Sequence, residues 1–81
     1  MSETSGKKAK ISDSELNFAI FLLHKLARAW QWPVPKVYRS LESSGILEGY
    51  IFKCYDVLHT LGAEYLVNDI TEFSREKGLA V

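Results

Sequence analysis

Cysteine, proline and glycine are scarce in this 81-residue chain, and their scarcity excludes several classes of protein. The single cysteine, Cys54, rules out an intrachain disulfide framework and a multi-cysteine zinc site, as expected in a reducing compartment. The five glycines are scattered and form no phosphate-binding loop. The apolar run at residues 18–23 is too short to span a bilayer, and the polar start lacks a secretory pattern. These absences predict a cytoplasmic protein without a cofactor.

The composition predicts one folded domain with a charged leader. Apolar residues make up 47% of the chain, enough to offset the entropy of ordering it. We expect residues 12–81 to form the domain and residues 1–11, with three lysines, to be a disordered basic tail. A solubilising role is the simplest for this tail, and contact with nucleic acid is the alternative. Residues 42–81 carry a net charge of −4, which would repel a phosphate backbone.

Hydrophobic spacing and helix-end signals predict an all-α fold. We expect a compact bundle of four helices at about residues 13–31, 35–44, 47–60 and 63–77. Ser12 and Glu15 have the spacing of a capping box, and Pro33 should end the first helix. Gly62 is expected to be the left-handed residue that ends the third helix. Gly49, inside that helix, is expected where another helix approaches closely. Glycines also mark the ends of the second and fourth helices, at Gly45 and Gly78.

The first predicted helix is more apolar than a single core face requires. Phe18, Phe21 and Leu22 widen its stripe, so the helix should be buried on most sides. A small domain has little interior for this surplus, and these three residues are therefore a candidate self-association patch in a homodimer, or a patch reserved for a partner. Trp30 and Trp32 are expected to close the base of the core rather than to bind a ligand.

Most of the unusual side chains lie around the predicted turn at Gly62. Because the turn is short, the two flanking helices should be neighbours and should gather these side chains at one corner. We take this corner as the candidate interaction site, and its members are Tyr55, Asp56, His59, Thr60, Glu64, Tyr65 and Asp69.

No set of residues makes a convincing catalytic or metal site. Cys54 and His59 are five positions apart on one predicted helix, so their side chains diverge, and the nucleophilic hydrolase they would form is the least favoured hypothesis. Asp56 and His59 are three apart, which lets the carboxylate reach the ring and fix a helix end. His24 and His59 lie on separate helices without further ligands. The sequence predicts a protein that is not an enzyme and binds no metal.

Residues 37–54 partly match a helix-turn-helix, with Gly45 in the turn. The second helix of this motif would present two acids and only one lysine to the major groove. A DNA-binding regulator is therefore the alternative function rather than the first.

Residues 55–70, YDVLHTLGAEYLVNDI, carry a specific resemblance. They are similar to the signature of a family of small uncharacterised bacterial all-helical proteins, at Tyr55 to Thr60, Gly62, Glu64 to Val67, Asp69 and Ile70. The likeness extends more loosely over residues 15–78. It implies a helical domain with no assigned biochemistry and no catalytic residues. Members of that family are often encoded beside a predicted ADP-ribosyltransferase-like protein, in an arrangement similar to a toxin–antitoxin locus.

The leading hypothesis is a small non-catalytic protein-interaction module. Its residues offer no active site, and the resemblance implies an antitoxin-like partner of an ADP-ribosyltransferase-like protein. We expect a protein partner, with neither nucleic acid nor membrane as a ligand.

Overall fold

The computed structural model describes residues 12–81, and the predicted basic tail, residues 1–11, lies outside the described residues. The described part of the chain is helical and contains no strand, which confirms the all-α class. Its elements in order are α2 (Asp13–Trp30), α3 (Val34–Ser43), η1 (Leu47–Phe52), α4 (Tyr55–Leu58) and α5 (Ala63–Glu76).

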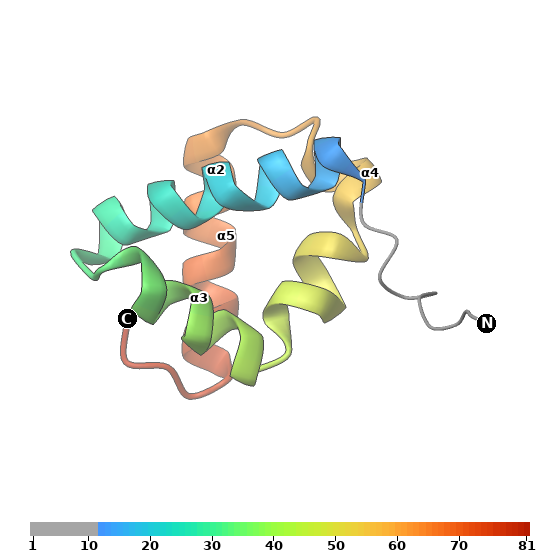
Figure 1. The fold of residues 1–81 in the computed structure, drawn as a ribbon. Helices are drawn as coiled ribbons and strands as arrows, with labels where there is room; N and C mark the ends of the chain where they lie inside the picture. Colours follow the sequence, from blue (N-terminus) through green and yellow to red (C-terminus); the bar gives the residue numbers. More distant parts are fainter. Residues whose placement is uncertain (1–11) are drawn as a thin grey trace.

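Helix α2 is the element against which most of the others pack. It contacts α3, η1 and α5. Figure 1 shows α5 crossing α2, while α3 returns beside α2 and leads through η1 to α4. Apolar side chains from each of these helices fill the space between them, and the core residues are Ala19, Leu22, Leu23, Leu26, Ala27, Val37, Leu41, Ile46, Leu47, Ile51, Leu58, Leu66 and Ile70.

Local signals set both ends of α2. The Ser12 backbone N–H donates to Glu15 Oε1 at 3.0 Å, and the Glu15 N–H donates to Ser12 Oγ at 3.1 Å, so the predicted capping box is confirmed. At the other end Gln31 takes a left-handed conformation, with φ of 59°, two residues before Pro33. The expectation that α2 is buried on most sides is wrong. It buries one face, and Leu16 and Ile20 are exposed.

The predicted third helix, residues 47–60, is divided in two. Residues Leu47–Phe52 form a π-helix, η1, and Cys54 then leaves helical backbone geometry, with φ of −103° and ψ of 20°, before α4 begins. Neither proline nor glycine marks this break. Tertiary contacts lie on both sides of it: Tyr50 reaches Asp69 on α5, and Tyr55 packs against Phe18 on α2. The four predicted helices are therefore five helical elements among the described residues.

Of the four expectations about the glycines, two are confirmed and two are wrong. Gly45 and Gly78 have φ of 84° and 97° and end α3 and α5 as predicted. Gly62 is not left-handed: with φ of −71° and ψ of 152° it precedes α5 as its N-cap, because the chain leaves α4 through a hydrogen-bonded turn instead. Gly49 is not a point of close approach, since a Cβ placed there has no neighbour within 4 Å.

The two tryptophans close one end of the bundle, as predicted. Their rings meet edge to face with centroids 5.2 Å apart, and both pack against the core. The Trp30 Nε1–H donates to Thr71 Oγ1 at 2.9 Å, which attaches the end of α2 to α5. Lys36 places its ammonium 4.2 Å from the Trp32 ring centroid and covers its outer face.

Candidate functional site

An aromatic column begins the predicted corner. The Tyr55 ring meets Phe18 edge to face with centroids 5.4 Å apart. On its other side Tyr55 stacks on the His59 ring, with centroids 4.6 Å apart and an angle of 14° between the planes. Phe18 is half-buried at the rim of the core and His59 is exposed. The column therefore connects α4 to α2 and leads from the core to the surface.

The predicted Asp56–His59 pair does not form. Within the described residues, the hydrogen-bonding partner of the His59 ring is the Tyr55 carbonyl, 2.8 Å from Nδ1. Stacking on Tyr55 orients the ring toward the preceding turn of the chain, and Asp56 stays exposed. His59 and Asp56 therefore do not form a hydrogen-bonded acid–base pair.

The turn from α4 to α5 is closed by its own hydrogen bonds. Thr60 Oγ1 donates to the Val57 carbonyl at 2.7 Å, and the Leu61 N–H donates to the Leu58 carbonyl at 3.0 Å. Leu58 is buried, and the bonded turn holds the side chains beside it in place. The corner is therefore an ordered structure whose side chains are presented from a fixed backbone.

Large apolar side chains are exposed around this turn. Val57 is 63% exposed, Tyr65 58% and Leu61 37%. Leu61 lies in the turn, beyond the end of α4 at Leu58. Exposed apolar groups that gather on one short segment are more typical of a binding surface than isolated ones are.

Helix α5 separates the remaining corner residues onto two sides. Glu64 faces α2, where it lines a hollow with Lys25, while Tyr65 and Asp69 line another hollow with Glu72. Consecutive residues on a helix point about 100° apart, so residues adjacent in sequence cannot all share a face. The structure therefore brings Tyr55 and His59 together, and it places Glu64 on one side of α5 and Tyr65 with Asp69 on another.

Tyr50 belongs to this region and sequence reasoning missed it. Its hydroxyl donates to Asp69 Oδ2, and its ring meets Phe73 edge to face with centroids 5.2 Å apart. Burial, followed by the hydrogen bond to Asp69 and the charge of that carboxylate, raises the pKa of the Tyr50 phenol. The contact joins η1 to α5 across 19 residues of sequence, and no local pattern marks it.

The predicted self-association patch is only partly at the surface. Leu22 is fully buried, so its place in the patch is wrong, because it points between α2 and its neighbours in the core. Phe18 is half-buried beneath Tyr55. Phe21 is 44% exposed, and the Lys25 ammonium lies 5.5 Å from its ring centroid. Of the three residues, Phe21 alone is exposed.

The other candidate chemical groups lie apart from this region or serve the backbone. Cys54 is a free, half-buried thiol at the start of α4 that packs against the core. The His24 ring nitrogen Nδ1 lies 2.9 Å from the Ile20 carbonyl on its own helix. Among residues 12–81, no three His, Cys, Asp or Glu side chains are grouped closely enough to bind a metal ion. None of the helices described in residues 12–81 combines the length and apolar character that crossing a bilayer requires.

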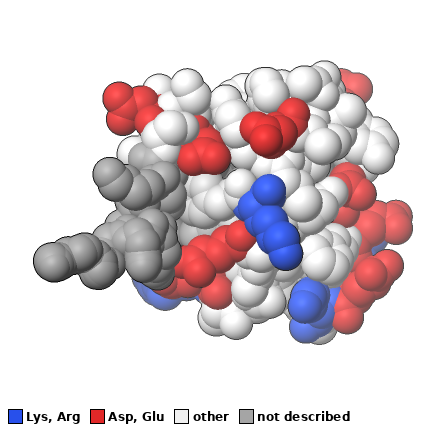
Figure 2. Space-filling view, turned by 90° about the vertical axis from the view of Figure 1, so that its right-hand side faces the viewer, with Lys and Arg blue, Asp and Glu red and all other residues white. Residues whose placement is uncertain are grey.

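The face shown in Figure 2 carries charges of both signs. Asp and Glu groups lie near its centre and toward its edges, a Lys or Arg group lies near its centre, and uncharged areas separate them.

The segment tested as a helix-turn-helix consists of α3, a turn at Gly45 and η1, and α3 contacts η1. Its second helix is a π-helix of six residues with Glu48 in its first turn. Lys53, directly after η1, is the one basic residue in the described segment 47–54.

The comparisons with known proteins give a family and no further match. No curated protein and no solved structure matches the chain. The family model described as "Protein of unknown function (DUF3791)" matches residues 17–77, from the second turn of α2 to the end of α5. This match covers most of the chain, which belongs to the DUF3791 family of proteins of unknown function.

Proposed function

We propose that this protein is a small, non-catalytic protein-interaction module. Its binding surface is the α4–α5 corner, which we define by Val57, His59, Leu61 and Tyr65. The observation that carries the proposal is the exposure of three large apolar side chains, which are Val57 in α4, Leu61 in the hydrogen-bonded turn and Tyr65 in the first turn of α5. A fixed backbone lowers the entropy lost on binding, and exposed apolar groups supply the area that a partner buries.

The charges near the corner favour a protein over a nucleic acid. Asp56 and Glu64 are exposed on the two helices that form the corner, and both would repel phosphates. A partner with basic side chains around an apolar centre would be attracted by the same carboxylates.

The partner that we propose is an ADP-ribosyltransferase-like protein, with this chain in an antitoxin-like role. The support is the resemblance of residues 55–70 to a family whose members are often encoded beside such proteins. A binding surface without catalytic groups fits a protein that acts by occupying its partner. We place this complex in the cytoplasm.

The test is a calorimetric titration of the full chain into an ADP-ribosyltransferase-like protein encoded beside a gene of this family. Tyr65→Asp and Val57→Asp should each weaken binding by about tenfold or more, because an aspartate in an apolar interface is desolvated without a partner. Tyr38→Asp is the matched control, since Tyr38 is 41% exposed but lies on α3. Equal losses for all three variants, or no binding by the wild-type chain, would contradict the proposal.

DNA binding through α3 and η1 is the alternative function. The helix–turn–helix order of this segment favours it, whereas the shortness of η1 and the charge of Glu48 disfavour it. An anisotropy titration with random duplex DNA at low salt separates the two functions. Micromolar affinity that survives replacement of Lys7, Lys8 and Lys10 by glutamine would favour DNA binding over the protein partner.

A further inference from the structure

A shallow hollow lies between α2 and the first turns of α5. Its volume is about 270 Å³, and its lining residues are Lys25, Ala63, Glu64, Val67 and Asn68. Ala63 and Val67 make the hollow apolar at its centre, and Val67 packs against the core below. The hollow is distinct from the α4–α5 corner, because Lys25 contributes from α2 and because Val57 and Tyr65 do not line it.

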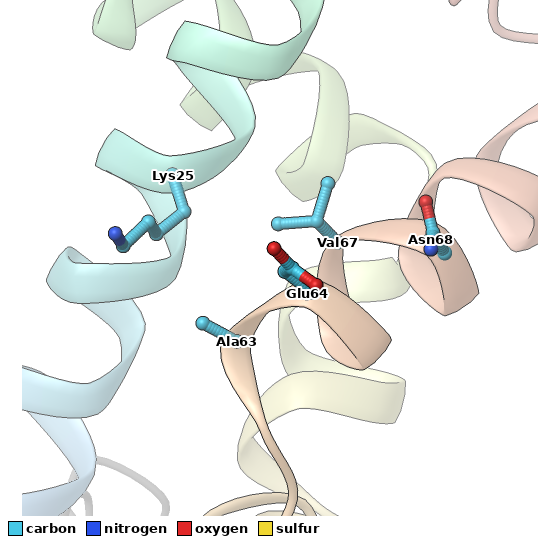
Figure 3. Close-up of a pocket in the computed structure, with 5 residues that line it drawn as sticks. All are labelled: Lys25, Ala63, Glu64, Val67 and Asn68. Carbon is cyan, nitrogen blue, oxygen red and sulfur yellow. The ribbon is translucent and has the colours of Figure 1, made fainter.

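Side chains of opposite charge line the two sides of this hollow. Figure 3 shows Lys25 on α2 on one side and Glu64 on α5 on the other, with Val67 between the two helices. Both charged side chains are exposed. The surface therefore runs from a positive group over an apolar centre to a negative group.

An exposed aromatic ring adjoins the positive side of the hollow. Phe21 lies one turn before Lys25 on α2, and the Lys25 ammonium is 5.5 Å from the centroid of its ring. With 44% of its surface exposed, Phe21 has apolar area still to bury beside a hollow with an apolar floor. The same face thus carries a projecting ring and a recess.

We propose that this face, defined by Phe21, Lys25, Glu64 and Val67, binds a second copy of the same chain around a two-fold axis. In a two-fold interface residue i of one copy meets residue j of the other, and j meets i. An axis above the hollow would set Lys25 of each copy opposite Glu64 of the other. The Phe21 rings would enter the apolar area between the two ion pairs. The pattern of charge is thus complementary to itself, which is the reason to assign a second copy rather than a different protein.

The charge of the whole chain favours this self-association. The formal net charge is zero at pH 7, so two copies meet without long-range repulsion. Small domains also bury a limited share of their surface, and pairing increases it.

Charge reversal tests the proposal. In sedimentation equilibrium over roughly a hundredfold range of concentration, the wild-type chain should pass from its monomer mass of 9.2 kDa toward twice that mass. Lys25→Glu alone, or Glu64→Lys alone, turns both intermolecular ion pairs into like-charge pairs. Each variant should therefore dimerise roughly tenfold or more weakly.

Mixing the two variants distinguishes contacts between copies from effects within one copy. A Lys25→Glu chain and a Glu64→Lys chain present only opposite charges to each other, so an equimolar mixture should form heterodimers at concentrations where each variant alone is monomeric. Any repulsion within each chain is unchanged by mixing. Far-ultraviolet circular dichroism of each variant verifies that it is folded, and Lys36→Glu on α3 is the matched reversal that should leave dimerisation unchanged.

Three results would overturn the proposal: a wild-type chain that stays monomeric, single reversals that dimerise as the wild type does, or a mixture that does not associate. The proposal does not depend on the protein partner at the α4–α5 corner. Lys25→Glu should keep the affinity for that partner, whereas Tyr65→Asp should lose it and still dimerise. The two proposals therefore fail separately.

Discussion

At the scale of single residues, a few hydrogen bonds from aromatic side chains to polar side chains join helices that are far apart in the sequence. Tyr50 donates to Asp69, and Trp30 donates to Thr71, so η1 and α2 are each bonded to α5. Such bonds to half-buried groups contribute modestly when made and are costly to leave unmade. Tyr50 and Trp30 are therefore the residues whose polar atoms should matter most to stability.

Tyr50 should make the fold sensitive to high pH. Its phenol keeps its proton more tightly when folded than in the unfolded chain, where the pKa is near 10.0. The unfolded state therefore loses this proton first, and the stabilisation, fully present below pH 10, is lost as pH rises above it. Urea titrations from pH 8 to pH 11 measure this effect. Above pH 10, each further pH unit should lower the folding equilibrium constant of the wild type by up to about tenfold more than that of Tyr50→Phe. Parallel curves for wild type and Tyr50→Phe would mean that the Asp69 contact does not affect ionisation.

Thr71 should stabilise the junction of α2 and α5. Thr71→Val keeps the shape of the side chain but leaves the Trp30 N–H without its acceptor at 2.9 Å. We expect a loss of about 1–2 kcal/mol in the free energy of unfolding, measured by urea titration with tryptophan fluorescence. Thr60→Val removes a comparable hydroxyl from an exposed turn and should cost less. Equal costs for the two variants would show that the Trp30 bond adds nothing beyond local hydrogen bonding.

At the scale of helices, the ends of α2 and α3 could be predicted because local residues determine them. Ser12 and Glu15 cap α2, Pro33 follows its end, and Gly45 takes the left-handed conformation that stops α3. The break between η1 and α4 could not be predicted, because Lys53 and Cys54 carry no helix-ending signal. Contacts far apart in sequence stabilise that break, and periodicity within one segment does not report them.

Two glycines near this break should respond in opposite ways to alanine. Both have open space around a new Cβ, but Gly45 has φ of 84° whereas Gly49 lies in η1. Gly49→Ala should raise the free energy of unfolding by about 0.5–1 kcal/mol, because alanine loses less entropy in a helix. Gly45→Ala should lower it by about 1–2 kcal/mol, since the left-handed region is strained for alanine. Thermal unfolding of both variants decides this, and a stabilising Gly45→Ala would contradict the conformation assigned to the turn.

At the scale of the whole molecule, the sequence located the candidate surface more accurately than it arranged the residues within it. Exposed Tyr65 and His59 lie where the corner was expected. Glu64 instead faces Lys25 across the hollow, since α5 turns it away from its sequence neighbours. Lys25 could not have been assigned to this surface from sequence, because its place there depends on how α2 crosses α5. Two faces result, one that we propose for a different protein and one that we propose for a second copy.

The division between core and surface on α2 gives the last prediction. Leu22 is fully buried and its neighbour Phe21 is 44% exposed, although both are large and apolar. Leu22→Ala should cost about 2–5 kcal/mol, a large part of the stability of a domain this small. Phe21→Ser should change stability by about 1 kcal/mol or less, because it removes only an exposed ring and its contact with Lys25. Urea titration at a concentration where the wild type is monomeric measures both effects. Sedimentation should then show that Phe21→Ser associates more weakly than wild type while remaining folded. If Phe21→Ser instead unfolds as Leu22→Ala does, the ring belongs to the core, and the second copy cannot bind at this face.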